Sequence, residues 1–319
     1  SEWLTLSELI TETHALAACK CDPNSEAEIV GCHGQTIWHR PPENNNIGGS
    51  IQILHAPLLA KLLNKKIVFD FRAADLVLGG QGAPLVPKTD EALLGRIPGW
   101  RALLNLGGIA NLTFIPPSCG VNRVCNVLGW DCGPANTLID LAVKKITGGK
   151  TFFDRDGLLA SKGTPKREIF QEWLKEPFFQ KLPPKSTGRD YFGVDDLERR
   201  YSELSQLSDY DFLATITAFS GSIIGDALNT FKLTYGSKPI EILISGGGAK
   251  NKTLVREIRS NCQGIIFKSI QDEGIPIESR EALSFALLAW WNILNFPGNS
   301  PSITGAKRSV VLGTCVEPV

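Results

Sequence analysis

The stretch GWDCGPANTLID, residues 129–140, joins an apolar run to a segment with the pattern of a helix. Asp131 lies at this transition, between Gly129 and Gly133. A carboxylate at the end of a strand can act as a general base or orient a metal-bound water. An Asp just before a helix is also a common cap that accepts hydrogen bonds from the first turn. The stretch alone leaves both roles of Asp131 open.

On both sides of this stretch, short apolar strand candidates alternate with helical patterns, and no long sequence repeat occurs. This alternation predicts an α/β architecture. We expect strands at 28–34, 66–71, 101–106, 109–115, 123–129 and 240–245, and helices at 1–21, 136–147, 211–232 and 281–294. The last helix is apolar nearly all round, so we expect it to be buried.

The chain has 319 residues, which is long enough for two domains that share a cleft. A connection rich in Pro, Gly and Gln at 78–87 is the best boundary. We expect a first domain at 1–84, a second at 85–299 and a C-terminal segment at 300–319 that returns to the first domain. The irregular stretch 178–193 is of a kind that is usually functional or mobile.

The composition favours small-molecule chemistry in the cytoplasm. Lys plus Arg and Asp plus Glu are both 33, so nothing indicates a nucleic-acid partner or a polybasic membrane patch. The sequence contains neither a long apolar run nor a signal peptide pattern. The 8 cysteines show no paired or Cys/His ligand spacing, so we expect core residues, no protein-bound metal such as zinc and no disulfides.

Methionine is absent, residue 1 is Ser, and the first helix is preceded by no strand. We therefore expect the sequence to begin downstream of the natural N-terminus.

Two glycine clusters follow strand candidates. The segment LLNLGGIANLTF, 103–114, centres on Gly107 and Gly108, where successive N–H groups could form a phosphate nest or a plain hairpin turn. The segment ILISGGGAKN, 242–251, runs from a strand through three glycines into a helix, and could lie against a nucleotide or merely connect two elements. Neither cluster is a GxGxxG fingerprint or a Walker P-loop.

Further polar candidates lie near other strand ends. His33 and Gln35 occur in a strand end flanked by glycines, and Arg72 follows another strand. They could bind polar groups of a ligand, or they could be structural hydrogen-bonding residues. Glu281 opens a helix, where the helix dipole alone favours an acid.

Two glycine clusters at strand ends, with an Asp between them, suggest the split nucleotide cleft of the actin, sugar kinase and Hsp70 superfamily. More specifically, the chain resembles the anhydro-N-acetylmuramic acid kinase family. The matching segments run in order from residue 31 to residue 313: GCHGQTIWHRP, VFDFRAADLVLGGQGAPLVP, LLNLGGIANLTFIP, GWDCGPANTLID, FFDRDG, LPPKSTGRDYF, LISGGGAKN, EALSFALLAW and PGNSPSITGAKRSVVLG.

The resemblance implies a two-domain actin-like ATPase fold, a duplicated RNase H-like fold with a central ligand cleft. It also implies ATP- and Mg²⁺-dependent opening of 1,6-anhydro-N-acetylmuramic acid to N-acetylmuramic acid 6-phosphate in peptidoglycan recycling. The family suggests a homodimer.

The resemblance also implies residue roles. Asp131 corresponds to the catalytic base, which activates the water that attacks the anomeric carbon. Arg72 and Glu281 look like sugar contacts, with His33 and Gln35 as weaker candidates. The second phosphate element corresponds to Asn105, Gly107 and Gly108, and the adenosine element to Gly246, Gly247, Gly248 and Asn251.

One feature of the family pattern is missing from the sequence. The family begins with a strand and a glycine/serine-rich first phosphate loop, and nothing similar occurs here. We expect that loop to precede Ser1 in the natural protein, because all later motifs are intact. The alternatives are a kinase for another sugar or anhydrosugar, and a non-catalytic sugar or nucleotide sensor with the same fold.

Overall fold

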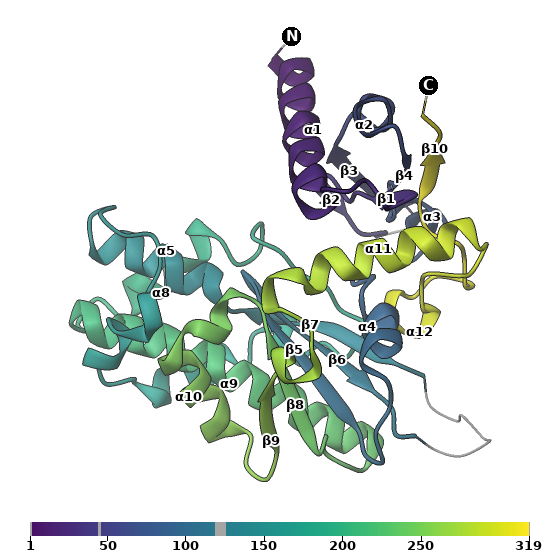
Figure 1. The fold of residues 1–319 in the computed structure, drawn as a ribbon. Helices are drawn as coiled ribbons and strands as arrows, with labels where there is room; N and C mark the ends of the chain where they lie inside the picture. The colour runs from purple at the N-terminus through teal and green to yellow at the C-terminus, as the bar shows by residue number, and fades with distance from the viewer. Residues whose placement is uncertain (1, 44–45, 119–125, 319) are drawn as a thin grey trace. The chain divides into compact units, whose positions relative to one another are not determined.

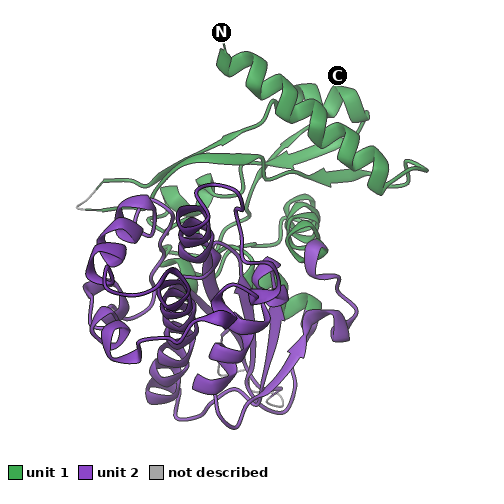
Figure 2. Cartoon of the chain, turned by 90° about the vertical axis from the view of Figure 1, so that its left-hand side faces the viewer, with its two compact units in different colours: residues 1–93, 279–319 green, residues 94–278 purple. Residues whose placement is uncertain are grey.

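The computed structural model describes residues 2–43, 46–118 and 126–318 (Figure 1). The chain divides into two compact units, one of residues 1–93 and 279–319 and the other of residues 94–278 (Figure 2). These bounds differ from the expected domains, since 85–93 and 279–299 are part of the first unit rather than the second.

The elements of unit 1 come from both ends of the sequence. They are α1 (Glu2–Cys21), β1 (Ile29–Gly31), β2 (Gln35–Arg40), β3 (Gly49–Ile53), α2 (Ala56–Leu63), β4 (Lys66–Phe69), α3 (Ala73–Val77), α4 (Pro87–Leu94, which ends at the boundary), α11 (Arg280–Ile293), α12 (Pro301–Thr304) and β10 (Thr314–Val316). Strand β4 is central in a three-stranded sheet, parallel to β1 and antiparallel to β10, while β2 and β3 form a separate hairpin.

Buried contacts explain why α4 and α11 belong to unit 1. Arg280, the first residue of α11, donates to both carboxylate oxygens of Asp90 on α4, at 3.0 and 2.5 Å. Phe285 of α11 packs in one apolar cluster with Val68 of β4 and with Phe71. A buried charge needs its partner, so this ion pair fixes the start of α11 to α4.

Unit 2 is the larger α/β unit. Its elements are β5 (Arg101–Leu106), β6 (Ile109–Ile115), β7 (Leu128–Pro134), α5 (Asn136–Ile146), η1 (Arg155–Gly157), η2 (Ala160–Lys162), α6 (Arg167–Trp173), α7 (Pro177–Gln180), α8 (Val194–Glu203), α9 (Asp209–Tyr235), β8 (Glu241–Ser245), η3 (Gly247–Lys250), α10 (Lys252–Asn261), β9 (Ile266–Ser269), η4 (Ile270–Glu273) and η5 (Ile277–Ser279).

The sheet of unit 2 has the order β7-β6-β5-β8-β9. Strands β5, β6 and β7 form an antiparallel meander, β8 is parallel to β5, and β9 is parallel to β8. Counted within the unit, this is the order 3-2-1-4-5 of an RNase H-like domain. It agrees with the fold expected from the sequence.

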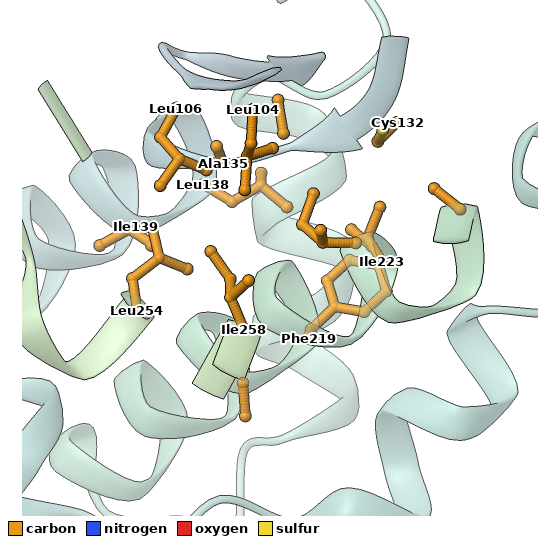
Figure 3. Close-up of a cluster of buried hydrophobic side chains, with 14 of the residues drawn as sticks. Leu104, Leu106, Cys132, Ala135, Leu138, Ile139, Phe219, Ile223, Leu254 and Ile258 are labelled. Carbon is orange, nitrogen blue, oxygen red and sulfur yellow. The ribbon is translucent and has the colours of Figure 1, made fainter. Parts of the chain in front are cut away.

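Side chains point alternately to the two faces of this sheet, and each face is covered by a cluster of buried residues. Leu104 and Leu106 of β5 pack with the helices α5, α9 and α10 in the main core cluster (Figure 3). Leu103 of β5 and Leu243 of β8 belong to a smaller cluster with Ile270 and Ile275. Strand β5 therefore has a fixed position, and so has the turn at its carboxyl end.

Several expected elements occur with small shifts. The expected strands 101–106 and 109–115 coincide with β5 and β6, and the expected helix 211–232 lies within α9. The expected strand 123–129 was wrong in position, since β7 spans Leu128–Pro134, and residues 123–125 of that prediction lie outside the described residues. Asp131 is therefore inside a strand rather than beyond its end.

The expectation that helix 281–294 is buried was also wrong. Helix α11 buries one face, which includes Phe285 and Leu288, whereas Trp290 is 58% exposed and Ile293 is 38% exposed. Some apolar residues of α11 therefore lie on the face of the helix that the rest of unit 1 does not cover.

Candidate active site

Asp131 is half-buried in β7, where it pairs with Asn111 of β6. Its Oδ2 accepts a hydrogen bond from the backbone N–H of Thr187 at 2.9 Å, and its own N–H donates to the carbonyl of Lys185 at 3.1 Å. The irregular stretch after α7 thus lies along Asp131 and fixes its carboxylate.

The helix-cap role that the sequence left open for Asp131 is wrong. Helix α5 begins at Asn136, and its N-cap residue is Ala135, whose side chain makes no capping hydrogen bond. The charge of Asp131 is therefore not explained by the start of the helix.

The turn between β5 and β6 is held by the first residues of α5. The carbonyl of Gly107 accepts from the backbone N–H of Asn136 at 3.1 Å and from its side-chain Nδ2 at 2.7 Å. The carbonyl of Gly108 accepts from the N–H groups of Ala135 at 2.9 Å and Thr137 at 3.0 Å. These hydrogen bonds fix the position of the glycine turn relative to the start of α5.

The second glycine cluster lies against the end of β5. Gly246 has φ +82°, and a Cβ on it would lie 2.8 Å from the backbone carbonyl group of Leu106. A Cβ on Gly248 would lie 2.8 Å from the Leu106 side chain, whereas Gly247 faces open space. The structure thus brings the two glycine clusters of the sequence together at Asn105 and Leu106.

A pocket of about 480 Å³ opens beside Gly247. Its lining is Asn136, Asp140, Phe153, Asp154, Arg155, Asp156, Gly247, Lys250 and Asn251. Asn251 caps α10, because its Oδ1 accepts the N–H of Leu254 at 2.9 Å. The volume and the mixture of polar and aromatic groups suit a nucleoside.

A second pocket of about 380 Å³ shares Asp140 with the first. It is lined by Thr137, Asp140, Leu141, Lys144, Phe152, Arg189, Gly193 and Val194. Burial raises the pKa of the Asp140 carboxyl to about 6, although the charge of Arg189 acts to lower it. Asp140 thus carries a titratable charge where the two pockets meet.

This shift makes the stability of the protein depend on pH. Because the pKa of Asp140 is raised in the folded state, the folded protein holds the proton more tightly, and this stabilisation is lost as the pH rises through about 6. We expect Asp140→Asn to raise the free energy of unfolding at pH 7.5 by about 1–2 kcal/mol, a value reduced for partial exposure, and by much less at pH 4. Urea titrations at both pH values measure this, and a difference independent of pH would contradict the assignment.

In unit 1, the predicted sugar contacts His33 and Arg72 lie close together. His33 packs on Phe285 with ring centroids 4.7 Å apart, and its Nδ1 bonds to the Gly34 carbonyl at 2.9 Å. Burial, aided by the charge of Arg72, lowers the pKa of His33 to about 4, so the ring is neutral at pH 7. Its Nε2 is buried and has no hydrogen-bond partner among the residues described.

Two hydrogen bonds connect Arg72 to Asp75 through the backbone of Gly82. Arg72 donates through Nη1 to the carbonyl of Gly82 at 2.5 Å, and the N–H of Gly82 donates to the buried Asp75 at 2.8 Å. Glu281 is exposed, one helical turn before Phe285 on α11. Gln35 begins β2 and is exposed.

The predicted site residues thus form two groups, one in each unit. The nucleotide candidates and Asp131 lie in unit 2, and the sugar candidates lie in unit 1. Sequence reasoning missed Asn136, Asp140, Thr187 and Arg189. Asn136 is the last position of the GPAN segment, and Thr187 and Arg189 belong to the irregular stretch 178–193, of a kind that is usually functional or mobile.

The described residues contain no group of three or more His, Cys, Asp and Glu side chains arranged to hold a metal ion. No helix within 2–43, 46–118 and 126–318 is both long enough and apolar enough to cross a membrane.

Comparisons with known proteins point to one family. The family model "Anhydro-N-acetylmuramic acid kinase" matches residues 5–318. A protein of that name from Prochlorococcus marinus (strain MIT 9313) is 56% identical over 317 residues, which cover 99% of this chain and 84% of the relative. One from Synechococcus sp. (strain CC9902) is 54% identical over 318 residues, with the same coverage.

Solved structures are more distant. The crystal structure of xylulose kinase from Rhodospirillum rubrum is 12% identical and has a TM-score of 0.40, over 73% of this chain and 44% of that one. This likeness carries no inference about function. The family model and the sequence relatives, in contrast, cover nearly the whole chain, and the chain therefore belongs to the anhydro-N-acetylmuramic acid kinase family.

Proposed function

We propose that the protein is an ATP-dependent kinase that hydrolytically opens 1,6-anhydro-N-acetylmuramic acid and phosphorylates O6. The product is N-acetylmuramic acid 6-phosphate, and the proposed role is peptidoglycan recycling. Family membership supports the reaction class. The observation that carries the mechanism is the Asp131 carboxylate, held by the Thr187 N–H in the strand next to the glycine hairpin.

The 1,6-anhydro sugar explains why the base must act on water. The substrate has no free 6-hydroxyl group, because O6 is bonded to C1. A base therefore has no proton to remove from O6. Asp131 instead takes a proton from water, whose oxygen attacks the anomeric carbon while the bond from C1 to O6 breaks. The freed O6 then attacks the γ-phosphorus of ATP. The bond from this phosphorus to the oxygen of the β-phosphate breaks, and ADP is released.

The residues of unit 2 fit a nucleotide. Asn105, Gly107 and Gly108 form the proposed phosphate element, and Gly246, Gly247, Gly248 and Asn251 form the proposed adenosine element. A Cβ at Gly246 or Gly248 would collide with β5, while Gly247 opens into the pocket of about 480 Å³, so the backbone there can lie flat against a ligand.

Mg²⁺ is part of the proposal. It typically takes one or two carboxylates together with phosphate oxygens and water, so it requires no cluster of three protein ligands. Asp131 and Asp140 are two carboxylates of unit 2 that could approach it. Bound Mg²⁺ would screen the charge between phosphoryl donor and acceptor.

In unit 1, Arg72 and Glu281 are the proposed sugar contacts, with His33 and Gln35 as further candidates. Because Nδ1 of the neutral His33 donates to the Gly34 carbonyl, Nε2 carries no proton and accepts a hydrogen bond, which a sugar hydroxyl group could donate. We place the enzyme in the cytoplasm, where ATP is available, and propose a homodimer.

Release of ADP tests the function. The protein as encoded is incubated with ATP, Mg²⁺ and one of three sugars: 1,6-anhydro-N-acetylmuramic acid, its ring-opened form, or glucose. We expect release of ADP that depends on the anhydro sugar. Turnover only with another sugar would indicate a different kinase, and nucleotide binding with no turnover would indicate a sensor.

A further inference from the structure

Alternate residues of the loop 185–189 anchor the loop, contact the proposed base and lie beside the phosphate turn. Lys185 is buried and donates through Nζ to the carbonyls of Phe178 at 3.2 Å and Phe179 at 3.4 Å, which anchors the loop. Two residues later, the N–H of Thr187 holds Asp131. Two residues further, Arg189 reaches the turn.

Arg189 lies beside Gly108. Its Nη2 and Nε are 3.6 and 3.7 Å from the position that a Cβ on Gly108 would occupy. The hydroxyl oxygen of Thr137 is 2.7 Å from the same position. Two side-chain donors, the Arg189 guanidinium and the Thr137 hydroxyl, therefore lie together beside the glycine turn.

Neither side-chain donor makes a hydrogen bond within the described part of the chain, although the charge of Arg189 acts on Asp140. Thr137 is 6% exposed, and its hydroxyl oxygen is buried without a hydrogen-bond partner, as is that of Thr187. Arg189 is exposed and makes no hydrogen bond or ion pair within the described part of the chain. Lys250, another cation of the pockets, is in contrast paired with Glu278 at 2.9 Å. Buried polar groups are nearly always satisfied, so the unpartnered hydroxyl of Thr137 indicates a missing ligand group, and the exposed guanidinium of Arg189 lies beside it.

We propose that Arg189, with the hydroxyl of Thr137 and the turn at Gly107 and Gly108, forms an oxyanion site that binds the phosphoryl group during its transfer. This inference rests on the proposed function. A guanidinium presents several N–H donors in a planar fork that matches phosphoryl oxygens, and its charge opposes the charge that develops on the transferring group.

The carboxylate of the sugar's lactyl group is the other oxyanion that the same donors could bind. The position of Arg189 at Gly108, in the turn proposed for phosphate, favours the phosphoryl group. The test therefore separates the two sources by comparing 1,6-anhydro-N-acetylmuramic acid with 1,6-anhydro-N-acetylglucosamine, which lacks the carboxylate.

The variants are Arg189→Gln and Arg189→Lys, with Arg256→Gln as the matched control. Arg256 is exposed on α10, and its recorded ion pair, with Glu257, is long at 3.7 Å. Thermal melting verifies that each variant folds. We expect Arg189→Gln to lower kcat about 100-fold with either sugar and to change KM for the sugar by less than about 3-fold. Arg189→Lys should recover part of the loss, and Arg256→Gln should match the wild type.

Calorimetric binding of ADP and of a slowly hydrolysed ATP analogue, without sugar, provides a readout that does not depend on turnover. The expected result is that Arg189→Gln loses the preference for the triphosphate. An unchanged preference and unchanged kcat would overturn the proposal. A loss of kcat confined to the carboxylate-bearing sugar would also overturn it and would assign Arg189 to the sugar. If the wild type turned over neither sugar, the proposed function would fail, while the binding experiment would still decide the role of Arg189.

Discussion

Replacing Asp131 with Asn is expected to lower kcat about 1,000-fold, with affinities for nucleotide and sugar that stay within about 3-fold of the wild type. An amide is not basic enough to take the proton of the attacking water. It nevertheless keeps an oxygen that can accept the Thr187 N–H, now at 2.9 Å, so the loop and the strand should stay in place. Steady-state kinetics together with calorimetric binding measure the two effects separately.

Asp195→Asn is the matched control for this variant. Asp195 is exposed on α8 and lines neither pocket, so its replacement should leave kcat unchanged. If Asp131→Asn retained more than about a tenth of the wild-type kcat, the carboxylate would have a structural role only.

Gly246→Ala is expected to weaken ATP binding about 100-fold and to lower the free energy of unfolding by about 2–3 kcal/mol. At φ +82° an added Cβ is strained, and it would lie 2.7 Å from Oδ1 of Asn105 and 2.8 Å from the Leu106 backbone. Backbone cannot move aside as a flexible side chain can, so the whole glycine loop must shift away from β5. Guanidinium titration and calorimetry with ATP measure the two effects.

Gly247→Ala is the comparison for Gly246→Ala. A Cβ on Gly247 meets nothing within 4 Å, so its stability should stay within about 0.5 kcal/mol of the wild type. Equal stabilities of the two variants would show that the close approach of Gly246 to β5 is not required.

The sequence was most informative where structure is local. The apolar runs on either side of Gly107 and Gly108 predicted β5 and β6 without error, because a two-residue glycine turn between such runs determines a hairpin. It was less informative for β7, which includes Asp131 and two glycines. Pairing with β6 extends that strand across residues that a local pattern counts as a break.

Contacts between distant residues account for what was missed. The hydrogen bond from Thr187 to Asp131 spans 56 residues, and no periodicity of either segment predicts it. The approach of His33 to Phe285 on α11 is similarly non-local. For α11, composition predicted burial all round, although the surrounding elements of unit 1 cover one face of the helix.

The mass of the sugar product decides whether hydrolysis and phosphorylation are coupled. The protein as encoded is incubated with ATP, Mg²⁺ and 1,6-anhydro-N-acetylmuramic acid in ¹⁸O-labelled water, and the product is analysed by mass spectrometry. The mechanism through Asp131 gives a product heavier by one phosphoryl group and one water, with the label on C1 rather than in the phosphate. A product heavier by the phosphoryl group alone, or unchanged sugar beside labelled inorganic phosphate, would contradict it.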